Sequence, residues 1–241
     1  MLGKFLELSL VTPDIRASLE FYVSLGFSHA EVGEAWTHPY AVVTDGRLCL
    51  GLHQIESFMP SMTFVRPDLL KHLDGLEQLG LAFEFRRLAA DVFNEVGWLD
   101  PSGHLVRLVE ARTFSPSKRK ATERSLCGYF NEIGLPTPNR EAAKQHWEQV
   151  GFIGMDEPDA PLPHVSCTSD SVNIGLYDPV HVREPTLCFE VDDVKGAVAR
   201  LAAAGITAQG RVPTPLRYSP AALLTAPEGT QVLLTGLSQP A

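Results

Sequence analysis

The side chains able to do chemistry are scattered singly along this chain of 241 residues. No nucleophile-elbow, phosphate-loop, dinucleotide-binding or HExxH zinc motif occurs. The cysteines lack CxxC spacing and lie in apolar or alternating segments, which predicts reduced core thiols rather than a zinc site or a disulfide framework. They are Cys49, Cys127, Cys167 and Cys188. Among eight histidines, His53 is the best candidate to point into a site, because it ends a predicted strand.

Composition excludes several classes of protein. The chain is 44% hydrophobic and 20% charged, which is typical of globular proteins. Its net charge of −9 argues against nucleic-acid binding, which needs a basic face. No apolar run approaches the roughly 20 residues of a membrane span, and the N-terminal segment does not resemble a signal peptide. We therefore expect a cytoplasmic protein with no membrane partner.

The elements that must position these side chains follow a fourfold repeat. Each copy begins with a short polar residue that can cap the start of a helix. Twelve residues later comes a glycine that can end the helix. The caps lie 54 residues apart within each half of the chain, and the halves are related by a shift of 125. The caps are Asp14, Asp68, Asn139 and Asp193, and the glycines are Gly26, Gly80, Gly151 and Gly205.

Alternating strands surround these predicted helices. The segment 47–53 matches 171–177 after a shift of 124, so that Tyr177 is the counterpart of His53. The turn sequences 100–103 and 226–229 each precede another strand. Each unit is predicted to run strand, helix and then about three strands. The domains are predicted at 1–111 and 125–241, with a linker at 112–124 that contains the basic run 118–120.

The segment 10–27, LVTPDIRASLEFYVSLGF, resembles the strand and helix of the vicinal oxygen chelate superfamily, which includes glyoxalase I, bleomycin-resistance proteins and extradiol dioxygenases. The DPSG turn at 100–103 is similar to the family's DPxG turn. The resemblance covers essentially the whole chain. It implies an α+β fold of four βαβββ units, paired into two domains whose sheets are cupped around a ligand. It does not imply one activity, because the superfamily hosts many reactions on this scaffold.

The resemblance also implies four metal-ligand positions in each cup. They fall on Glu7, Gly51, Ser61 and Arg107 in the first half, and on Glu132, Gly175, Thr186 and Leu233 in the second. Glycine and leucine cannot ligate a metal, and arginine places a cation where the ion would be. We therefore expect no tightly bound metal and no other cofactor, unless this assignment of positions is wrong.

The remaining polar residues suggest a ligand site. Glu7 and Arg107 are expected to face each other, as a salt bridge or as a base and a carboxylate-binding cation. Glu132 has no such partner, and a carboxylate alone in an apolar cup should have a raised pKa. The predicted ligand-binding residues are Glu7, His53, Arg107, Glu132 and Tyr177, with Glu7 and Glu132 as candidate catalytic groups. Trp36, Tyr40 and Tyr218 are candidates for the cup rims.

Three functions remain open at this point. The first is a protein that binds a small, hydrophobic or cationic organic molecule without a metal. The second is a lyase or dioxygenase-type enzyme acting on a small oxygenated substrate, with or without a metal. The third is a protein–protein module whose cups are filled by its own side chains. A monomer and a homodimer are both compatible with the sequence.

Overall fold

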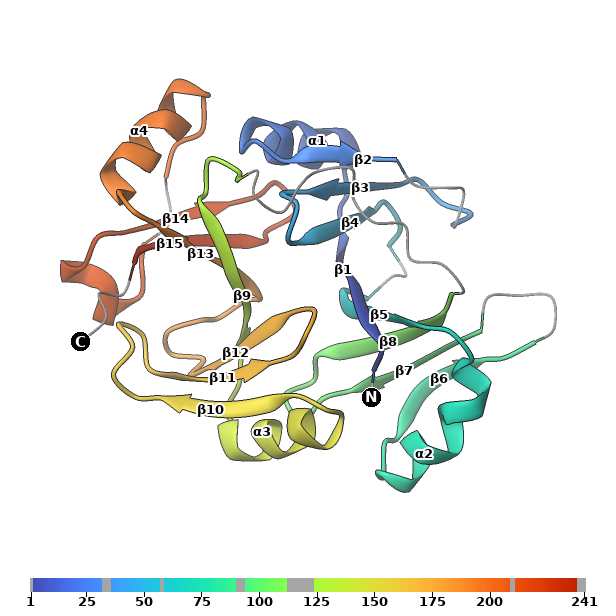
Figure 1. Ribbon diagram of the computed structural model, residues 1–241. Helices are drawn as coiled ribbons and strands as arrows, with labels where there is room; N and C mark the ends of the chain where they lie inside the picture. The colour runs from blue at the N-terminus through green and yellow to red at the C-terminus, as the bar shows by residue number, and fades with distance from the viewer. Residues whose placement is uncertain are drawn as a thin grey trace.

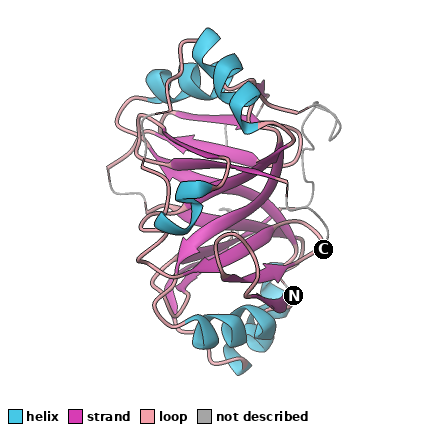
Figure 2. Ribbon diagram, turned by 90° about the vertical axis from the view of Figure 1, so that its left-hand side faces the viewer, coloured by secondary structure: helices cyan, strands magenta, loops and turns pink. Residues whose placement is uncertain are grey.

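The computed structural model describes residues 2–31, 36–56, 59–89, 94–111, 124–208 and 211–237. It has the predicted α+β architecture, with one mixed sheet of eight strands in the first half and one of seven in the second. Most of the predicted linker, residues 112–123, lies outside the described residues. Most helices gather at two opposite ends of the molecule with the strands between them, and one short helix lies beside the strands midway (Figure 2).

The first half contains two units in one sheet. The first comprises β1 (Lys4–Val11), α1 (Ile15–Ser24), β2 (Ser28–Ala30), β3 (Tyr40–Thr44) and β4 (Cys49–His53). The second comprises β5 (Ser61–Arg66), the 3₁₀ helix η1 (Leu69–His72), α2 (Leu73–Gln78), β6 (Phe83–Arg87), β7 (Glu95–Leu99) and β8 (Leu105–Glu110). The strand order is β2-β3-β4-β1-β5-β8-β7-β6, which places β1 and β5 at the centre (Figure 1).

The second half repeats this plan. Its first unit comprises β9 (Tyr129–Pro136), α3 (Arg140–Gln149), β10 (Ile153–Glu157), β11 (His164–Thr168) and β12 (Asn173–Tyr177). Its second comprises β13 (Thr186–Val191), α4 (Val194–Ala203), the 3₁₀ helix η2 (Thr214–Tyr218), β14 (Ala221–Thr225) and β15 (Gln231–Gly236). In the part of the chain that the structure describes, this last unit has two strands after its helix rather than the predicted three.

The predicted helix signals act as expected at most ends. All four terminating glycines have positive φ, between 77° and 108°, a conformation that costs other residues energy. Asp14 accepts hydrogen bonds from the backbone N–H groups of Arg16 and Ala17, and Asn139 accepts one from Ala142. Asp68 and Asp193 make no such capping bond, and the segment after Asp68 begins as a 3₁₀ helix.

One hydrophobic core joins the two halves. It contains residues of both central strands, such as Leu8 and Ile133, and of helices from both halves, such as Tyr22 and Trp147. Across the boundary Phe27 packs edge-on against Phe189, with ring centroids 6.3 Å apart. The buried cysteines Cys127 and Cys167 belong to this core, as predicted for core thiols.

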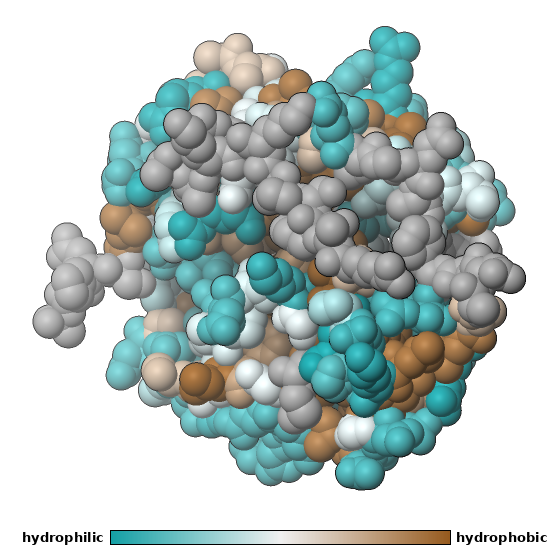
Figure 3. Space-filling model, turned by 45° about the vertical axis from the view of Figure 1, so that its right-hand side comes forward, coloured by the Kyte–Doolittle hydropathy of each residue, from teal (hydrophilic) through white to brown (hydrophobic). Residues whose placement is uncertain are grey.

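One face of the molecule has mixed polarity. Hydrophilic residues are interspersed with hydrophobic ones over the face drawn in Figure 3. Among the described residues, no helix is both long enough and apolar enough to cross a bilayer.

Candidate functional site

Both central strands carry a buried glutamate directly after a β-bulge. In β1 the register against β5 shifts between Phe5 and Glu7, so that Leu6 is the extra residue. In β9 the corresponding shift leaves Asn131 extra, immediately before Glu132. A bulge changes the direction of the side chains that follow it. Glu7 and Glu132 are only 2% and 1% exposed, on the sheet faces opposite those that carry core residues such as Leu8 and Ile133.

At the second metal-ligand position implied for each cup, a glycine leaves space for the glutamate carboxylate. A Cβ atom added to Gly51 would overlap the carboxylate of Glu7, and one added to Gly175 would overlap that of Glu132. Gly51 and Gly175 lie on β4 and β12, the strands that pair in parallel with β1 and β9. Each glycine therefore allows a glutamate to fold over the neighbouring strand.

Glu7 is the acceptor for three side chains in the first cup. Its Oε1 accepts a hydrogen bond from Ser9 Oγ at 2.8 Å and lies 3.3 Å from His53 Nε2. Its Oε2 accepts one from the Tyr40 hydroxyl at 2.5 Å. His53 Nδ1 in turn lies 2.9 Å from His38 Nε2. These contacts form a continuous series from the half-buried His38 and Tyr40 to the buried carboxylate.

Burial shifts the pKa values of Tyr40 and His38, the outer members of this series. The pKa of Tyr40 is raised far above its ordinary value, first by burial and then by the charge and hydrogen bond of Glu7. The pKa of His38 is lowered by burial and by the nearby His53 and Arg107. Tyr40 therefore keeps its proton and remains a donor at neutral pH.

Arg107 faces a different partner from the one expected. Its Nη1 donates to Glu95 Oε2 at 2.7 Å, and the other oxygen of Glu95 accepts from Arg87 Nη1 at 2.7 Å. The predicted Glu7–Arg107 pair is therefore wrong: β7 brings Glu95 next to β8, with Gly97 rather than a larger residue opposite Arg107. The guanidinium carbon also lies 5.0 Å from the ring centroid of Phe85 and 5.7 Å from that of Trp36.

The second cup holds the same residue types with two of them exchanged. Glu132 Oε1 accepts a short hydrogen bond from the Tyr177 hydroxyl and lies 3.3 Å from His164 Nε2. The sequence had suggested a Glu132 carboxylate alone in an apolar cup, and the structure instead gives it two partners. Tyr40 pairs with His53 across β3 and β4, whereas His164 pairs with Tyr177 across β11 and β12.

Neither His164 nor the hydrogen bond from Tyr40 to Glu7 was predicted, although the repeat relates these two residues. The shift of 124 residues that relates His53 to Tyr177 also relates Tyr40 to His164. A tyrosine and a histidine thus occupy the same two places in both halves, in opposite order. Of the other predicted rim residues, Trp36 lies against His53 with ring centroids 5.2 Å apart, and Tyr218 is 94% exposed on η2.

The two cups differ in polarity. Around Glu7 the floor carries hydroxyl groups, with Thr63 Oγ1 lying 2.8 Å from Ser9 Oγ and 3.1 Å from Ser61 Oγ. In the second half a small apolar cluster of buried residues covers the corresponding floor, and the cavity beside it is only about 80 Å³. That cluster consists of Leu162, Tyr177, Val182, Cys188, Leu216 and Leu233.

The residues at the four implied metal positions do not fit a divalent ion. Each cup offers one carboxylate, and the remaining places hold glycine, a hydroxyl group, and either Arg107 or Leu233. In the first cup the carboxylate is engaged by Ser9, Tyr40 and His53. Over the described ranges, no group of three or more His, Cys, Asp or Glu side chains is arranged to hold an ion.

Comparison with known proteins gives structural matches alone. No protein-family model matches the sequence, and no curated protein matches it. Among solved structures, the 2,3-dioxygenase LapB from Pseudomonas sp. KL28 matches with a TM-score of 0.64 and 16% identity, over 100% of this chain and 96% of that one. A catechol 2,3-dioxygenase matches with a TM-score of 0.59 and 15% identity, over 100% and 90% of the two chains.

A glyoxalase extends the likeness to a second activity. The Mn(II)-bound glyoxalase from Novosphingobium aromaticivorans matches with a TM-score of 0.63 and 14% identity, over 98% of this chain and 82% of that one. At such low identity these matches define the architecture and not the reaction. The chain has the vicinal oxygen chelate fold, with two paired βαβββ domains.

Proposed function

We propose that the first cup binds a small oxygenated organic molecule without a tightly bound metal ion. One observation carries the proposal: around its buried glutamate the first cup has Ser9, Thr63 and Arg107, where the second has glycine, Cys188 and Leu233. Burying charged and polar groups opposes folding, so an apolar floor such as that around Leu233 would cost less. The presence of Ser9, Thr63 and Arg107 on the floor of the first cup is then explained by a ligand that uses them.

The arrangement suggests a role for each group. The Glu7 carboxylate can accept from a ligand hydroxyl group, since its Oε2 is engaged by Tyr40 alone and has a second lone pair. Arg107 supplies a fixed positive charge for a ligand carboxylate. The half-buried rings of Trp36, His38 and Tyr40 lie beside His53 and offer a surface on which a planar ligand can stack. A planar molecule carrying hydroxyl and carboxylate groups would match all three features.

The test uses protein treated with a metal chelator and three probes: catechol, benzoate and 3,4-dihydroxybenzoate. Binding is followed by quenching of tryptophan fluorescence, since Trp36 is in the cup whereas Trp98 and Trp147 are fully buried in the core. We expect saturable binding of 3,4-dihydroxybenzoate. Glu7→Gln should weaken binding of both hydroxylated probes about tenfold, because it removes a charged acceptor. Arg107→Met should weaken binding of both carboxylated probes instead.

Glu132→Gln provides the matched control in the second cup, and also tests the ligand-binding role predicted for Glu132 and Tyr177. It should leave the binding of all three probes unchanged. The proposal fails if none of the probes binds, if binding requires an added divalent ion, or if Glu7→Gln and Glu132→Gln behave alike.

A further inference from the structure

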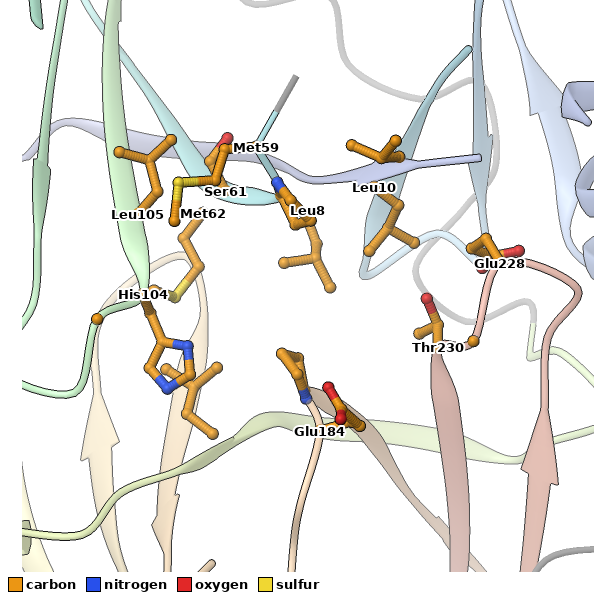
Figure 4. Close-up of a pocket in the computed structure, with 16 residues that line it drawn as sticks. Leu8, Leu10, Met59, Ser61, Met62, His104, Leu105, Glu184, Glu228 and Thr230 are labelled. Atoms are coloured by element: carbon orange, nitrogen blue, oxygen red, sulfur yellow. The ribbon is translucent and has the colours of Figure 1, made fainter. Parts of the chain in front are cut away.

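A cavity of about 550 Å³ lies between the two halves and, among the described residues, shares only Ser61 with the first cup. Figure 4 shows it as a space between β1 above and β9 below, with the start of β8 on one side and the loop before β15 on the other. Its volume is within the range of small-molecule sites. Because residues of both halves line the cavity, it forms only where the two halves of the chain pack together.

The body of this cavity is apolar. Leu8 and Leu10 point into it from β1, and Met62 and Leu105 line it from β5 and β8 (Figure 4). Leu135 contributes from β9. These aliphatic and thioether side chains can accommodate the hydrocarbon part of a ligand.

The charged groups of the lining are carboxylates. Glu184 and Glu228 line the cavity, and the described residues of its lining include no lysine or arginine. Glu184 makes no side-chain hydrogen bond or ion pair among the described residues. Glu228 accepts from the Tyr22 hydroxyl at 2.6 Å and from Ser18 Oγ at 2.7 Å. Both donors are neutral, and among the described residues neither Glu184 nor Glu228 forms an ion pair with a lysine or arginine.

His104, another polar side chain of the lining, also offers an acceptor. His104 Nε2 lies 3.0 Å from the carbonyl oxygen of Pro136. A carbonyl oxygen only accepts, so Nε2 carries the hydrogen, and Nδ1 of the neutral ring is left as an acceptor. The imidazole ring points into the cavity opposite Glu184 (Figure 4). A ligand that contacts Glu184, Glu228 and His104 supplies hydrogen-bond donors to them, whereas the hydroxyl groups of Ser61 and Thr230, also in the lining, can donate or accept.

The two halves contribute side chains of different charge to this cavity, as the sequence repeat makes clear. The shift of 125 residues that relates the halves places Glu184-Pro185-Thr186 where the first half has Met59-Pro60-Ser61. Glu228 corresponds to Ser102 after a shift of 126 residues. The negative charge thus comes from the second half, and the first half supplies the greater part of the apolar wall.

We propose that this interdomain cavity binds an organic cation, a protonated amine attached to an apolar body. Glu184 pairs with the ammonium group at the open edge, and His104 and Glu228 accept from its remaining N–H groups or lie within its field. The apolar body packs against Leu8, Leu10 and Met62. This site is separate from the first cup and does not depend on the function proposed for it.

The test compares three probes of similar shape by isothermal titration calorimetry: 2-phenylethylammonium, 2-phenylethanol and 3-phenylpropanoate. The full-length protein should bind the cation about fivefold or more tightly than the neutral alcohol, as expected for a partly exposed ion pair. It should bind the carboxylate most weakly. Glu184→Gln should abolish the preference for the cation over the alcohol.

Two further variants sharpen the result. Met59→Glu adds a carboxylate at the related position of the first half and should tighten cation binding. Glu141→Gln makes the same change of charge on the exposed face of α3, away from the cavity, and should have no effect. Equal binding of cation and alcohol, tighter binding of the carboxylate, or no measurable binding of the cation would overturn the proposal. Loss of the preference for the cation in Glu184→Gln, with binding in the first cup retained, separates the two sites.

Discussion

Glu7 and Glu132 depend on glycines that come more than 40 residues later in the chain. Gly51 and Gly175 take positions at which the resemblance implied metal ligands, and both leave space for a carboxylate. The same sequence feature, a glycine in an otherwise apolar strand, thus has a packing explanation. Close approach of a neighbouring group is a common reason for glycine within a strand.

Gly51→Ala is predicted to destabilise the protein by about 1–3 kcal/mol, the usual cost of forcing an extra carbon into a packed site. The added Cβ would displace the Glu7 carboxylate from the donors Ser9 and Tyr40. Urea unfolding measures the change in free energy.

Gly75→Ala is the matched control for this substitution. Gly75 lies in α2 with no atom within 4 Å of an added Cβ, so alanine there should be neutral or stabilise by about 0.5–1 kcal/mol. Equal effects of the two substitutions would show that Gly51 is not constrained by Glu7.

Strand pairing determines how each cup surrounds its glutamate. The antiparallel register of β11 and β12 sets His164 directly opposite Tyr177, and the rings stack with centroids 4.5 Å apart. Both side chains then reach Glu132 on β9, the next strand of the sheet. The pair of strands therefore acts as one unit that delivers two donors to one carboxylate.

The stability contributed by His164 is predicted to depend on pH. Burial lowers the pKa of His164, but the hydrogen bond and charge of Glu132 outweigh it, so the pKa is raised above 6.5. A raised pKa in the folded state stabilises the protein below the unfolded value and ceases to do so as the pH rises through the folded value. The stability difference between wild type and His164→Asn should therefore be larger at about pH 6 than at about pH 9.

Urea unfolding at the two pH values checks this difference, and an NMR titration of the imidazole checks the pKa itself. Glu132→Gln should remove the pH dependence while leaving the stacked rings in place. A pKa of His164 below that of free histidine would contradict the prediction.

At the scale of the whole molecule, the shared core makes the halves one folding unit. Phe189 of β13 contacts Phe27 from the first half and Phe130 from the second, with ring centroids 6.3 Å and 5.4 Å apart. Trp98 Nε1 of the first half also lies 3.3 Å from His146 Nε2 of the second. Such contacts couple the stability of the two domains.

Phe189→Ala should therefore destabilise both halves together, by about 3–5 kcal/mol. Unfolding curves followed by the fluorescence of single-tryptophan variants, retaining either Trp98 or Trp147, should coincide before and after the substitution. Separate transitions for the two tryptophans would show that the halves unfold independently.

Much of the fold could be predicted because its signals are local. The helix-ending glycines, the caps Asp14 and Asn139, and the repeat of 125 residues identify four units without reference to distant contacts. The resemblance placed Glu7 and Glu132 in the cups, and the repeat related His53 to Tyr177, which the structure brings to these glutamates. The segment that the repeat relates to β6, residues 208–212, includes residues 209 and 210, which lie outside the described part of the chain.

The sequence by itself determined the duplicated architecture of strand–helix–strand units, since backbone conformation and strand alternation are properties of short segments, and its resemblance to a known family implied one glutamate in each cup. Only the tertiary structure decided that Arg107 pairs with Glu95 instead of Glu7, that His164 and Tyr40 complete the two clusters, and that an acidic, apolar-walled cavity lies between the halves. These features depend on strand register, on bulges and on the packing of one half against the other. They join residues far apart in the chain, whose contacts no local pattern records.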